Sequence, residues 1–509
     1  MYANINIAAL YRRAPLYSTR FSIDTANPGI YSCKRSTGKR APGRRAGTDV
    51  EGTMDKTDKY SLVSGGIVSK LFLIAAPLLA TQFFQMAYNL TDMFWLGRLS
   101  SDAVAASGTV GLFLWMSLAF LFFGRIGAEI GVSQNIGRGD KEKALAFAQN
   151  AIIISVVIGV ILAFIIILGR FPMIGFFGIP EAHVEKDARE YLMIVSFSMP
   201  MAFLTAAVSG VFNGVGNSRT SLIINGVGFL ANMALDPLLI FSAGLGIRGA
   251  GIATIIAHST AACLSLIMLK KYNKRPFETI KLFKRPDTKI IKQIFKWVTP
   301  ISIESFFFTF LTMLIAALIA PYGASAMAAS RVGSQIESLT WLIVGGYSSA
   351  LTSFTGQNFG AGKWGRIRKG FKVSTAIMSG WGIIVGLVLF FGGRVLIGIF
   401  IPDSPEVVRI GVEYMRILAV VQIPQCIEGV ASGVFRGQGK TIPPSVGSVT
   451  SNALRVVLAY TLTHYTDLGL TGIWIAIAIG AVIRGLWIYS WYILYSRGKQ
   501  KTDTDQATA

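Results

Sequence analysis

The feature that most constrains this chain is a series of long apolar stretches, which begins near Val68 and continues almost to the C-terminus. Each stretch approaches the roughly 20 residues that an α-helix needs to cross the hydrocarbon core of a bilayer. Only 15% of the residues are charged, against about 25% in soluble domains, so most of the apolar surplus must face lipid. We count twelve stretches, centred near Ala80, Trp115, Val156, Pro200, Leu230, Ala257, Phe310, Leu339, Val385, Ile423, Ala453 and Ala481. The chain is therefore predicted to be an all-α polytopic membrane protein with twelve transmembrane helices.

Basic residues are concentrated in every second connection between these stretches. Lys141, Arg219, Lys363 and Lys440 follow even-numbered stretches, whereas the other connections are short or acidic. Because Lys and Arg collect in cytoplasmic loops, we predict a multi-pass protein of the cell membrane with both termini in the cytoplasm. The net charge of +22 is interpreted as a topology signal, and no nucleic-acid partner is expected.

Five short sequence matches link the two halves of the chain, and the two members of each match are as far apart in the sequence as Pro77 and Pro300. We call this separation the repeat offset. The matches pair Pro77 with Pro300, Gln134-Asn135 with Gln357-Asn358, Tyr191 with Tyr414, Ser209–Phe212 with Ser432–Phe435, and Gly246 with Gly469. A shared offset over most of each half indicates an internal duplication. Six spans separate the copies, so both halves enter the membrane in the same direction. We predict two pseudo-symmetric six-helix lobes around a central cavity, related as a parallel repeat by an axis along the membrane normal.

The composition divides the chain into five segments. They are a basic N-terminal extension (1–60), an N-terminal lobe (61–269), a basic cytoplasmic linker (270–296), a C-terminal lobe (297–495) and a polar cytoplasmic tail (496–509). The extension is predicted to be disordered because it holds too few apolar residues to form a core. Two interpretations of it stay open: a functional tail, or an upstream start included by mistake before Met54.

Polar and acidic residues inside the spans of the first half suggest a functional site. An ionisable group costs at least about 2.5 kcal/mol at mid-membrane on insertion scales, so it must be satisfied or functional. Asp92 lies near the end of the first span and Asp236 near the end of the fifth, with Thr254 at a similar depth in the sixth. Asn232 and Asp236 are four residues apart, on one helix face. This oxygen cluster suits Na⁺, or a carboxylate pair that holds a proton.

Two simpler interpretations apply to the same residues. Asp92 could merely face interfacial water, and Asp236-Pro237 could only accommodate a helix bend. The missing counter-charge favours the functional interpretation. Arg125 and Glu129, four residues apart, can pair with each other, which leaves Asp92 and Asp236 without a basic partner.

The second half has lost this cluster. At the repeat positions of Asp92, Asn232 and Asp236 stand Ile315, Arg455 and Ala459, and the intramembrane charges are Glu304, Glu337, Glu428, Arg455 and Arg484. Glu304 and Glu428 could form an acidic locus that attracts cationic substrates, or these acids could pair with the arginines and fix the packing. Phe308 and its neighbouring phenylalanines could line a cavity for flat cations.

These residues resemble the multidrug and toxic compound extrusion (MATE) family of secondary transporters, from about Lys70 to Tyr495. The resemblance is carried by Pro77 with Asn89–Asp92, by Gln134-Asn135-Ile136-Gly137 and its copy Gln357-Asn358-Phe359-Gly360, and by Asn232–Pro237 followed by Gly246–Thr254. It implies an antiporter that exports lipophilic, often cationic, drugs in exchange for H⁺ or Na⁺ by alternating access. Small-molecule substrates, the bilayer and no cofactor are implied as well, and we expect a monomer.

The resemblance is closer to the DinF-like branch of the family than to the NorM-like branch. In the former, the coupling cation is held by residues that match Asp92, Asn232, Asp236 and Thr254, and Pro237 is the predicted hinge. In the latter, a glutamate and an aspartate act in the C-terminal lobe. The aligned positions here are Phe308 and Gln425, with Glu304 and Glu428 displaced by about one turn, so these four residues are expected to line the substrate cavity.

A flippase or exporter of lipid-linked saccharides, which shares the two-lobe architecture, remains as the alternative function. Its cavity should be cationic to hold pyrophosphate, which only Arg455 and Arg484 favour. A channel is also conceivable. An enzyme is not expected, since no nucleophile with a base and no phosphate-binding loop is present. Three scattered cysteines and three isolated histidines predict no metal site other than Na⁺ at the coupling residues.

Overall fold

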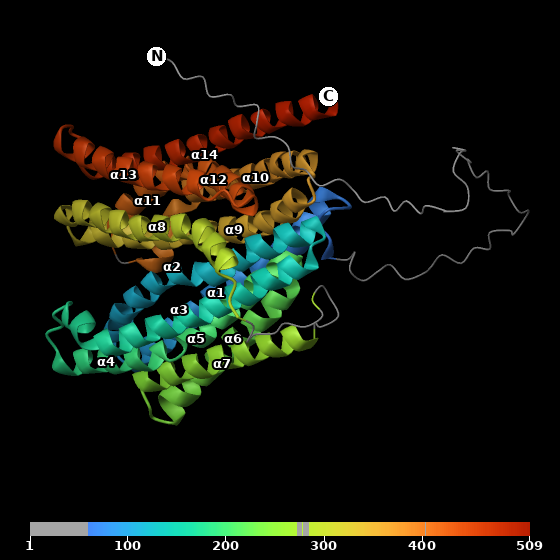
Figure 1. The fold of residues 1–509 in the computed structure, drawn as a ribbon. Coiled ribbons are helices and arrows are strands. Elements are labelled where there is room, and N and C mark those ends of the chain that lie inside the picture. Colours follow the sequence, from blue (N-terminus) through green and yellow to red (C-terminus); the bar gives the residue numbers. More distant parts are fainter. Residues whose placement is uncertain (1–59, 272–276, 278–284, 403, 509) are drawn as a thin grey trace, which may run out of the picture. The chain divides into compact units, whose positions relative to one another are not determined.

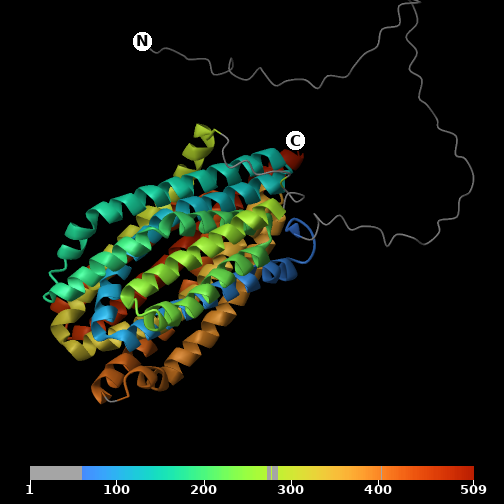
Figure 2. The same cartoon turned by 90° about the horizontal axis from the view of Figure 1, so that it is seen from below.

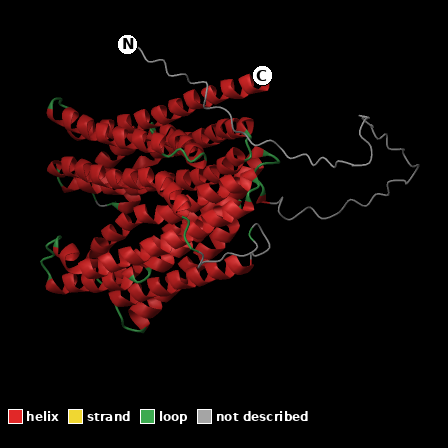
Figure 3. Cartoon of the chain, in the orientation of Figure 1, coloured by secondary structure: helices red, strands yellow, loops and turns green. Residues whose placement is uncertain are grey.

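The computed structural model describes residues 60–271, 277, 285–402 and 404–508. The predicted N-terminal extension, except Tyr60, and much of the predicted linker lie outside the described residues. Within the described part of the chain, every regular element is a helix (Figure 3).

The helices form two consecutive groups, coloured blue to green and yellow to red in Figures 1 and 2. The first group comprises α1 (Ile67–Leu99), α2 (Ser101–Arg138), α3 (Lys141–Gly175), α4 (Ala182–Ser196), α5 (Met199–Val215), α6 (Ser218–Pro237), the π-helical turn η3 (Leu238–Ser242) and α7 (Ile247–Lys271). The second comprises α8 (Thr288–Ile319), the 3-10 turn η4 (Ala320–Tyr322), α9 (Ala324–Gly360), α10 (Trp364–Phe400), α11 (Pro405–Ala419), α12 (Gln422–Gly437), α13 (Ile442–His464) and α14 (Gly469–Thr508).

Two helices extend into segments that the sequence assigned to connections. Helix α8 starts at Thr288, inside the predicted linker, because the Asp287 side chain caps it by accepting a hydrogen bond from the Lys289 backbone N at 2.8 Å. Helix α14 continues to Thr508, through most of the predicted polar tail.

Eight helical segments are long and apolar enough to cross a membrane, and two bent pairs, α4–α5 and α11–α12, bring the number to ten in the described residues. Helices α9 and α13 do not meet that criterion, being rich in Ser, Gly and Thr. They hold the same places in the second lobe as α2 and α6 hold in the first. Counted by position in the repeat, the described chain provides six spanning units in each lobe, which confirms the predicted fold class.

The helix boundaries repeat with the offset found in the sequence. Ala182 and Pro405 begin α4 and α11, and Met199 and Gln422 begin α5 and α12, so that each pair is separated by the repeat offset. The bends between the paired helices are also alike, at 45° in the first lobe and 50° in the second. The duplication is therefore visible in the backbone as well as in the matched residues.

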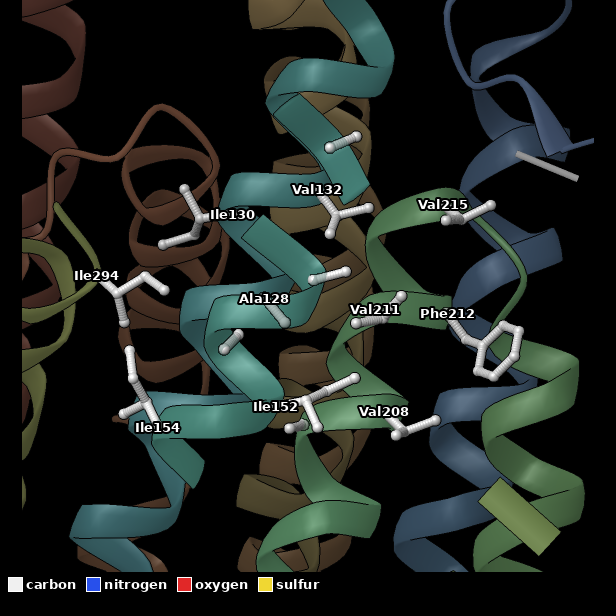
Figure 4. Close-up of a cluster of buried hydrophobic side chains, with 14 of the residues drawn as sticks. Ala128, Ile130, Val132, Ile152, Ile154, Val208, Val211, Phe212, Val215 and Ile294 are labelled. Carbon is white, nitrogen blue, oxygen red and sulfur yellow. The ribbon is translucent and has the colours of Figure 1, made fainter. Parts of the chain in front are cut away.

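The first half of α8 is buried in the core of the N-terminal lobe. Ile294 and Trp297 belong to one hydrophobic cluster with residues of α2, α3 and α5, and Figure 4 shows Ile294 on the side of Ile130 and Ile154. The lobe boundary predicted at residue 297 therefore does not separate the two hydrophobic cores.

The first half of α1 makes the equivalent crossing into the C-terminal lobe. Leu71 and Ile74, the repeat counterparts of Ile294 and Trp297, pack in a cluster with residues of α9, α10, α12 and α14. Leu96, near the end of α1, belongs instead to a cluster of the N-terminal lobe. Each opening helix thus joins the core of one lobe to the core of the other.

Two equivalent glutamines join the lobes at the ends of α2 and α9. Gln134 Nε2 donates to the Gly437 carbonyl at 2.9 Å. Gln357 Nε2 donates to the carbonyls of Gly214 and Val215 at 3.0 and 2.9 Å. Gly214 and Gly437 are themselves repeat counterparts, so the contacts are pseudo-symmetric. We call the region defined by Gln134, Gln357, Gly214 and Gly437 the lobe seam.

Glycine is required where the two helix ends approach each other at the seam. A Cβ atom on Gly137 would lie 1.9 Å from the Gln357 carbonyl oxygen, and one on Gly360 would lie 1.9 Å from the Gln134 carbonyl oxygen. The conflict is with backbone atoms, which cannot rotate away. The repeated Gln-Asn-x-Gly motifs therefore combine an amide that bonds across the seam with a glycine that permits the approach.

Glu129 is a third component of this region, and its contacts differ from the predicted pairing with Arg125. The Glu129 carboxylate is 3% exposed, and its Oε1 accepts hydrogen bonds from Ser349 Oγ at 2.8 Å and Ser353 Oγ at 3.0 Å. Arg125 acts on Glu129 electrostatically but forms no ion pair with it among the described residues. Spacing along one helix did not reveal that α9 supplies closer donors.

A short N-terminal segment, Tyr60–Ser64, covers the seam. The Leu62 backbone N donates to Gln357 Oε1 at 3.0 Å, and its carbonyl accepts from Asn358 Nδ2 at 3.2 Å. On the other lobe, a Cβ on Gly216 would lie 2.5 Å from the Tyr60 carbonyl oxygen. The segment therefore contacts both lobes where they meet.

We predict that Gly137→Ala lowers the stability of the protein by about 1–3 kcal/mol, because the added methyl group overpacks the seam. The measurement is thermal unfolding of the purified protein in detergent. Gly380→Ala in α10 is the matched control, since nothing lies within 4 Å of its Cβ position and alanine is favoured in a helix interior. Equal behaviour of the two variants would contradict the close approach at Gly137.

Candidate functional site

The structure brings together the N-terminal-lobe residues that the sequence singled out. Asn232 and Asp236 stand near the end of α6, and Thr254 faces them from α7. One orientation of the Asn232 side-chain amide gives hydrogen-bond partners to both its nitrogen and its oxygen. In that orientation Nδ2 donates to Asp236 Oδ2 at 2.9 Å and Oδ1 accepts from the Thr254 backbone N at 3.2 Å. Asp92 approaches from α1, close enough to act on Asp236 electrostatically. We call these four residues the acidic site.

Three residues of the acidic site are buried and Asp92 is half-buried, and no positive side chain of the described chain compensates the two carboxylates. Asp236 is 0% exposed and Asn232 is 1% exposed. Asp92 Oδ1 and Asp236 Oδ1 are buried and have no hydrogen-bond partner among the described residues. No basic side chain in the described chain acts on either carboxylate. Since buried polar atoms are almost always satisfied, these two oxygens indicate a place for a proton or a cation.

Two tyrosines complete the site, and the sequence did not assign them to it. Tyr88 interacts with Thr254 through its side chain, and both Asp92 and Asp236 act on it electrostatically. Tyr191, which is 5% exposed, is acted on by the same two carboxylates. Tyr88 lies four residues before Asp92 on one helix face, a spacing that could have revealed it. Tyr191 appeared in the sequence only as a repeated residue.

The backbone beside Asp236 departs from α-helical geometry. Pro237 has no N–H to donate and ends α6, and the chain continues as η3, in which the Ala243 N donates to the Leu238 carbonyl five residues earlier at 2.9 Å. Such π-helical turns are rare and occur frequently at functional sites. The predicted hinge at Pro237 thus coincides with a change of helix type.

Gly249 of α7 allows this turn to lie close to the acidic site. A Cβ atom on Gly249 would be 2.6 Å from the backbone C and O of Leu239 and 2.9 Å from Ile240 N. Helix α7 therefore supports η3 by backbone contact, five residues before Thr254. The position of η3 therefore depends on the position of α7, the helix that carries Thr254.

The C-terminal lobe holds a different polar cluster at the equivalent place. Arg455, which replaces Asn232, donates from Nη2 to Thr312 Oγ1 at 2.8 Å, and its guanidinium lies 5.5 Å from the centre of the Phe308 ring. Glu337 accepts a hydrogen bond from Gln425 Nε2 at 2.6 Å and another from Tyr414 OH at 3.5 Å. Tyr414 is the counterpart of Tyr191 in the repeat.

The predicted substrate-cavity residues are divided among several contacts. Glu304 accepts from Ser445 Oγ at 2.8 Å, whereas Glu428 accepts from Ser432 Oγ at 2.9 Å and lies 3.8 Å from Arg484. Glu304 and Glu428 act on each other electrostatically, so they do belong to one region. Gln425 and Phe308 lie instead beside Glu337 and Arg455. Of the acid–arginine pairs that the sequence allows, Glu428–Arg484 is therefore formed among the described residues, at a distance close to the upper limit for an ion pair.

Comparison with known proteins supports one family. The sequence profile of the MatE family matches residues 77–238 and 300–461, two ranges whose starts and ends are each separated by the repeat offset. A probable multidrug resistance protein NorM of Thermotoga maritima is 28% identical over 428 residues, which cover 82% of this chain and 90% of the relative. A probable multidrug resistance protein YoeA of Bacillus subtilis is 25% identical over 458 residues, or 88% of this chain and 97% of the relative.

A solved structure shares the fold. It is of a MOP superfamily transporter from Pyrococcus furiosus, with a TM-score of 0.80 and 21% identity, covering 88% of this chain and 99% of that chain. The names of the relatives do not confirm the predicted proximity to the DinF-like branch. They do confirm that the chain is a transporter rather than an enzyme. By the match to both halves of the repeat, the chain belongs to the MatE family of multidrug-efflux membrane transporters.

Proposed function

We propose that the protein is an antiporter that exports lipophilic, often cationic, compounds in exchange for H⁺ or Na⁺. The observation that carries the proposal is the acidic site, where Asp92 and Asp236 are close enough to interact electrostatically and have no basic partner in the part of the chain that the structure describes. Two ionised carboxylates in one buried place repel each other and are stabilised by a proton or a cation. Thr254 Oγ1 supplies a further oxygen atom, and a Na⁺ ligand would require Asn232 to turn its amide oxygen toward the carboxylates, where Nδ2 donates to Asp236.

Alternating access follows from exchange at this site. The cation binds to the acidic site from outside, neutralises the carboxylates and favours a bend at Pro237 and η3, which releases the exported compound. Return to the inward-facing state then delivers the cation to the cytoplasm. Compound and cation compete because both are attracted by the same two carboxylates. Glu304, Glu428, Phe308 and Gln425 are proposed to line the cavity for the compound in the other lobe.

The proposed placement is in the cell membrane as a monomer, with both termini in the cytoplasm. Tyr60–Ser64, close to the N-terminus, lies on the lobe seam. The seam is then on the cytoplasmic side, and the inter-lobe hydrogen bonds of Gln134, Gln357 and Glu129 close that side. The structure would accordingly correspond to the outward-facing state of the transport cycle.

Export of lipid-linked saccharides is the second candidate function. The presence of Arg455 and Arg484 in the C-terminal lobe favours it, because a pyrophosphate group needs cationic partners. That activity would not require Asp92 and Asp236. The experiment below therefore distinguishes the two candidates as well as testing the first.

We predict that Asp92→Asn and Asp236→Asn each reduce export of a fluorescent lipophilic cation to background, because each variant removes one of the two carboxylates on which the proposed cation exchange depends. The assay is export from cells and from proteoliposomes with an imposed pH gradient or Na⁺ gradient. Asp467→Asn, on an exposed residue between α13 and α14, is the matched control and should export normally. Undiminished export by both site variants would overturn the coupling assignment.

The same proteoliposomes distinguish the coupling ion. Export that a pH gradient drives in Na⁺-free buffer indicates H⁺, and export that needs a Na⁺ gradient at equal pH indicates Na⁺. Export that responds to neither gradient would contradict antiport.

We predict that Gly249→Ala reduces coupled export by roughly tenfold to 100-fold, since its methyl group overlaps the Leu239 carbonyl and displaces η3 relative to α7, and a misplacement of about 1 Å can cost up to ~100-fold. Gly226→Ala on α6 is the control, because nothing lies within 4 Å of its Cβ position. Both variants are also compared by thermal unfolding, so that a transport defect can be separated from a loss of folded protein. Normal export by Gly249→Ala would show that the position of η3 does not matter.

A further inference from the structure

We propose that Arg455 and Arg484 form a subsite for the carboxylate or phosphate group of an exported aromatic compound. The inference rests on the proposed export function and names a substrate class within it, namely compounds that carry an anionic group on a flat ring system. It gives a role to two intramembrane arginines that cation coupling at the acidic site does not use.

Arg455 has hydrogen-bonding capacity that the protein does not satisfy. Within the described residues, no carboxylate oxygen lies within 4.0 Å of it. Its Nη2 donates to Thr312 Oγ1 at 2.8 Å, and its Nε is buried without a partner. A guanidinium has five N–H donors in a fixed fork. A charge of this kind within a membrane helix is costly and therefore indicates a functional site.

Arg484 contributes a second guanidinium from α14, the helix that packs on Arg455 at Gly480, one turn before Arg484, where a Cβ atom would lie 2.8 Å from Arg455 Cβ. It is 7% exposed, and its Nε is buried without a partner in the described chain. Its distance of 3.8 Å to Glu428 is longer than the roughly 2.7–2.9 Å of a charge-assisted hydrogen bond. The two guanidinium groups act on each other electrostatically. An anion between them would relieve this repulsion and satisfy the unused donors.

The neighbouring carboxylates already have partners. Glu337 is the competing anion, since it acts on Arg455 from beyond 4.0 Å, but its two oxygens accept hydrogen bonds from Gln425 and Tyr414. Glu428 accepts from Ser432. Apart from the hydrogen bond to Thr312, the N–H donors of Arg455 are thus available to a ligand.

The surrounding rings indicate what the anionic group is attached to. Arg455 lies over Phe308, whose side chain is 42% exposed, and Arg484 lies 4.9 Å from the ring centre of Trp341. Planar guanidinium groups bind carboxylates and phosphates in a bidentate manner and also stack on aromatic faces. A flat ring with a carboxylate or phosphate matches both features, whereas a purely cationic compound is repelled by both arginines.

The test compares two dyes that differ by one charge: a rhodamine with a free carboxylate, and the methyl ester of the same rhodamine. Binding is measured by fluorescence polarisation on the full chain in detergent, and export is measured in proteoliposomes of phosphatidylcholine. We expect Arg455→Gln to weaken binding of the acid dye by about tenfold or more, as for loss of a hydrogen bond to a charged group. Binding of the ester dye should not weaken.

Two further variants separate the site from general damage. Arg455→Lys keeps the positive charge but loses the bidentate N–H geometry of the guanidinium. It should therefore retain part of the affinity for the acid dye. Arg394→Gln, on an exposed arginine of α10, should leave both dyes unaffected. If Arg455→Gln does not fold, as judged by thermal unfolding, the preference of Arg455→Lys for acid over ester decides the question.

Two results would overturn the proposal. One is an equal change in the binding of both dyes in the Arg455 variants. The other is displacement of the acid dye by phosphatidylglycerol without any export of that dye, which would assign the arginines to an anionic lipid headgroup. In either case, gradient-dependent export of the ester dye would show that the proposed antiport stands independently.

Discussion

The rest of the structure depends on the lobe seam, where two glutamine side chains bond to backbone carbonyls of the opposite lobe. A glutamine amide can donate to a helix-end carbonyl that has no partner within its own helix. Gln134 and Gln357 do so at equivalent positions, and Gly137 and Gly360 remove the side chains that would keep α2 and α9 apart. The duplicated sequence thus produces a self-complementary contact, in which each copy provides both the donor and the acceptor.

The duplication has preserved the scaffold but not the chemistry. In the N-terminal lobe, Asp92 and Asp236 have no basic partner among the described residues, which is the basis of the proposed cation exchange. In the C-terminal lobe, the positively charged side chain of Arg455 occupies the repeat position of Asn232. Equivalent helices of the two lobes therefore carry an acidic site in the N-terminal lobe and a partly basic cluster in the C-terminal lobe. Under the two proposals, this asymmetry separates the site of the coupling ion from the site of an anionic part of the exported compound.

The sequence predicted the features that arise from length and periodicity. Apolar stretches of spanning length and one constant offset were sufficient for the two-lobe fold, because both are properties of the chain itself. Asn232 and Asp236 could be placed together because four residues make one helical turn.

Features that depend on packing between distant helices were not predictable in this way. The burial of Ile294 in the opposite lobe, the serines that bond to Glu129, and the support of η3 by Gly249 all require knowledge of which helices meet. A hydrophobic pattern shows that a helix face is buried, but not against what. For the same reason, Arg125 was predicted to be the partner of Glu129, when α9 supplies two closer donors.

The crossing of α1 determines how the acidic site can influence the lobes. Leu71 holds its first half in the C-terminal core, and Leu96 holds its end in the N-terminal core. Asp92 lies between these anchors, so in the proposed transport cycle a relative movement of the lobes acts on the part of α1 that carries the site. A neutral seam hydrogen bond contributes only about 0.5–1.5 kcal/mol, because water replaces it when the lobes separate. Reversing a two-state equilibrium from 1:99 to 99:1 requires a differential affinity of about 5.5 kcal/mol. In the proposed mechanism, a cation held between α1 and α6 acts on the part of α1 between its two anchors, whereas the hydrophobic cores that hold Leu71 and Leu96 need not be disrupted.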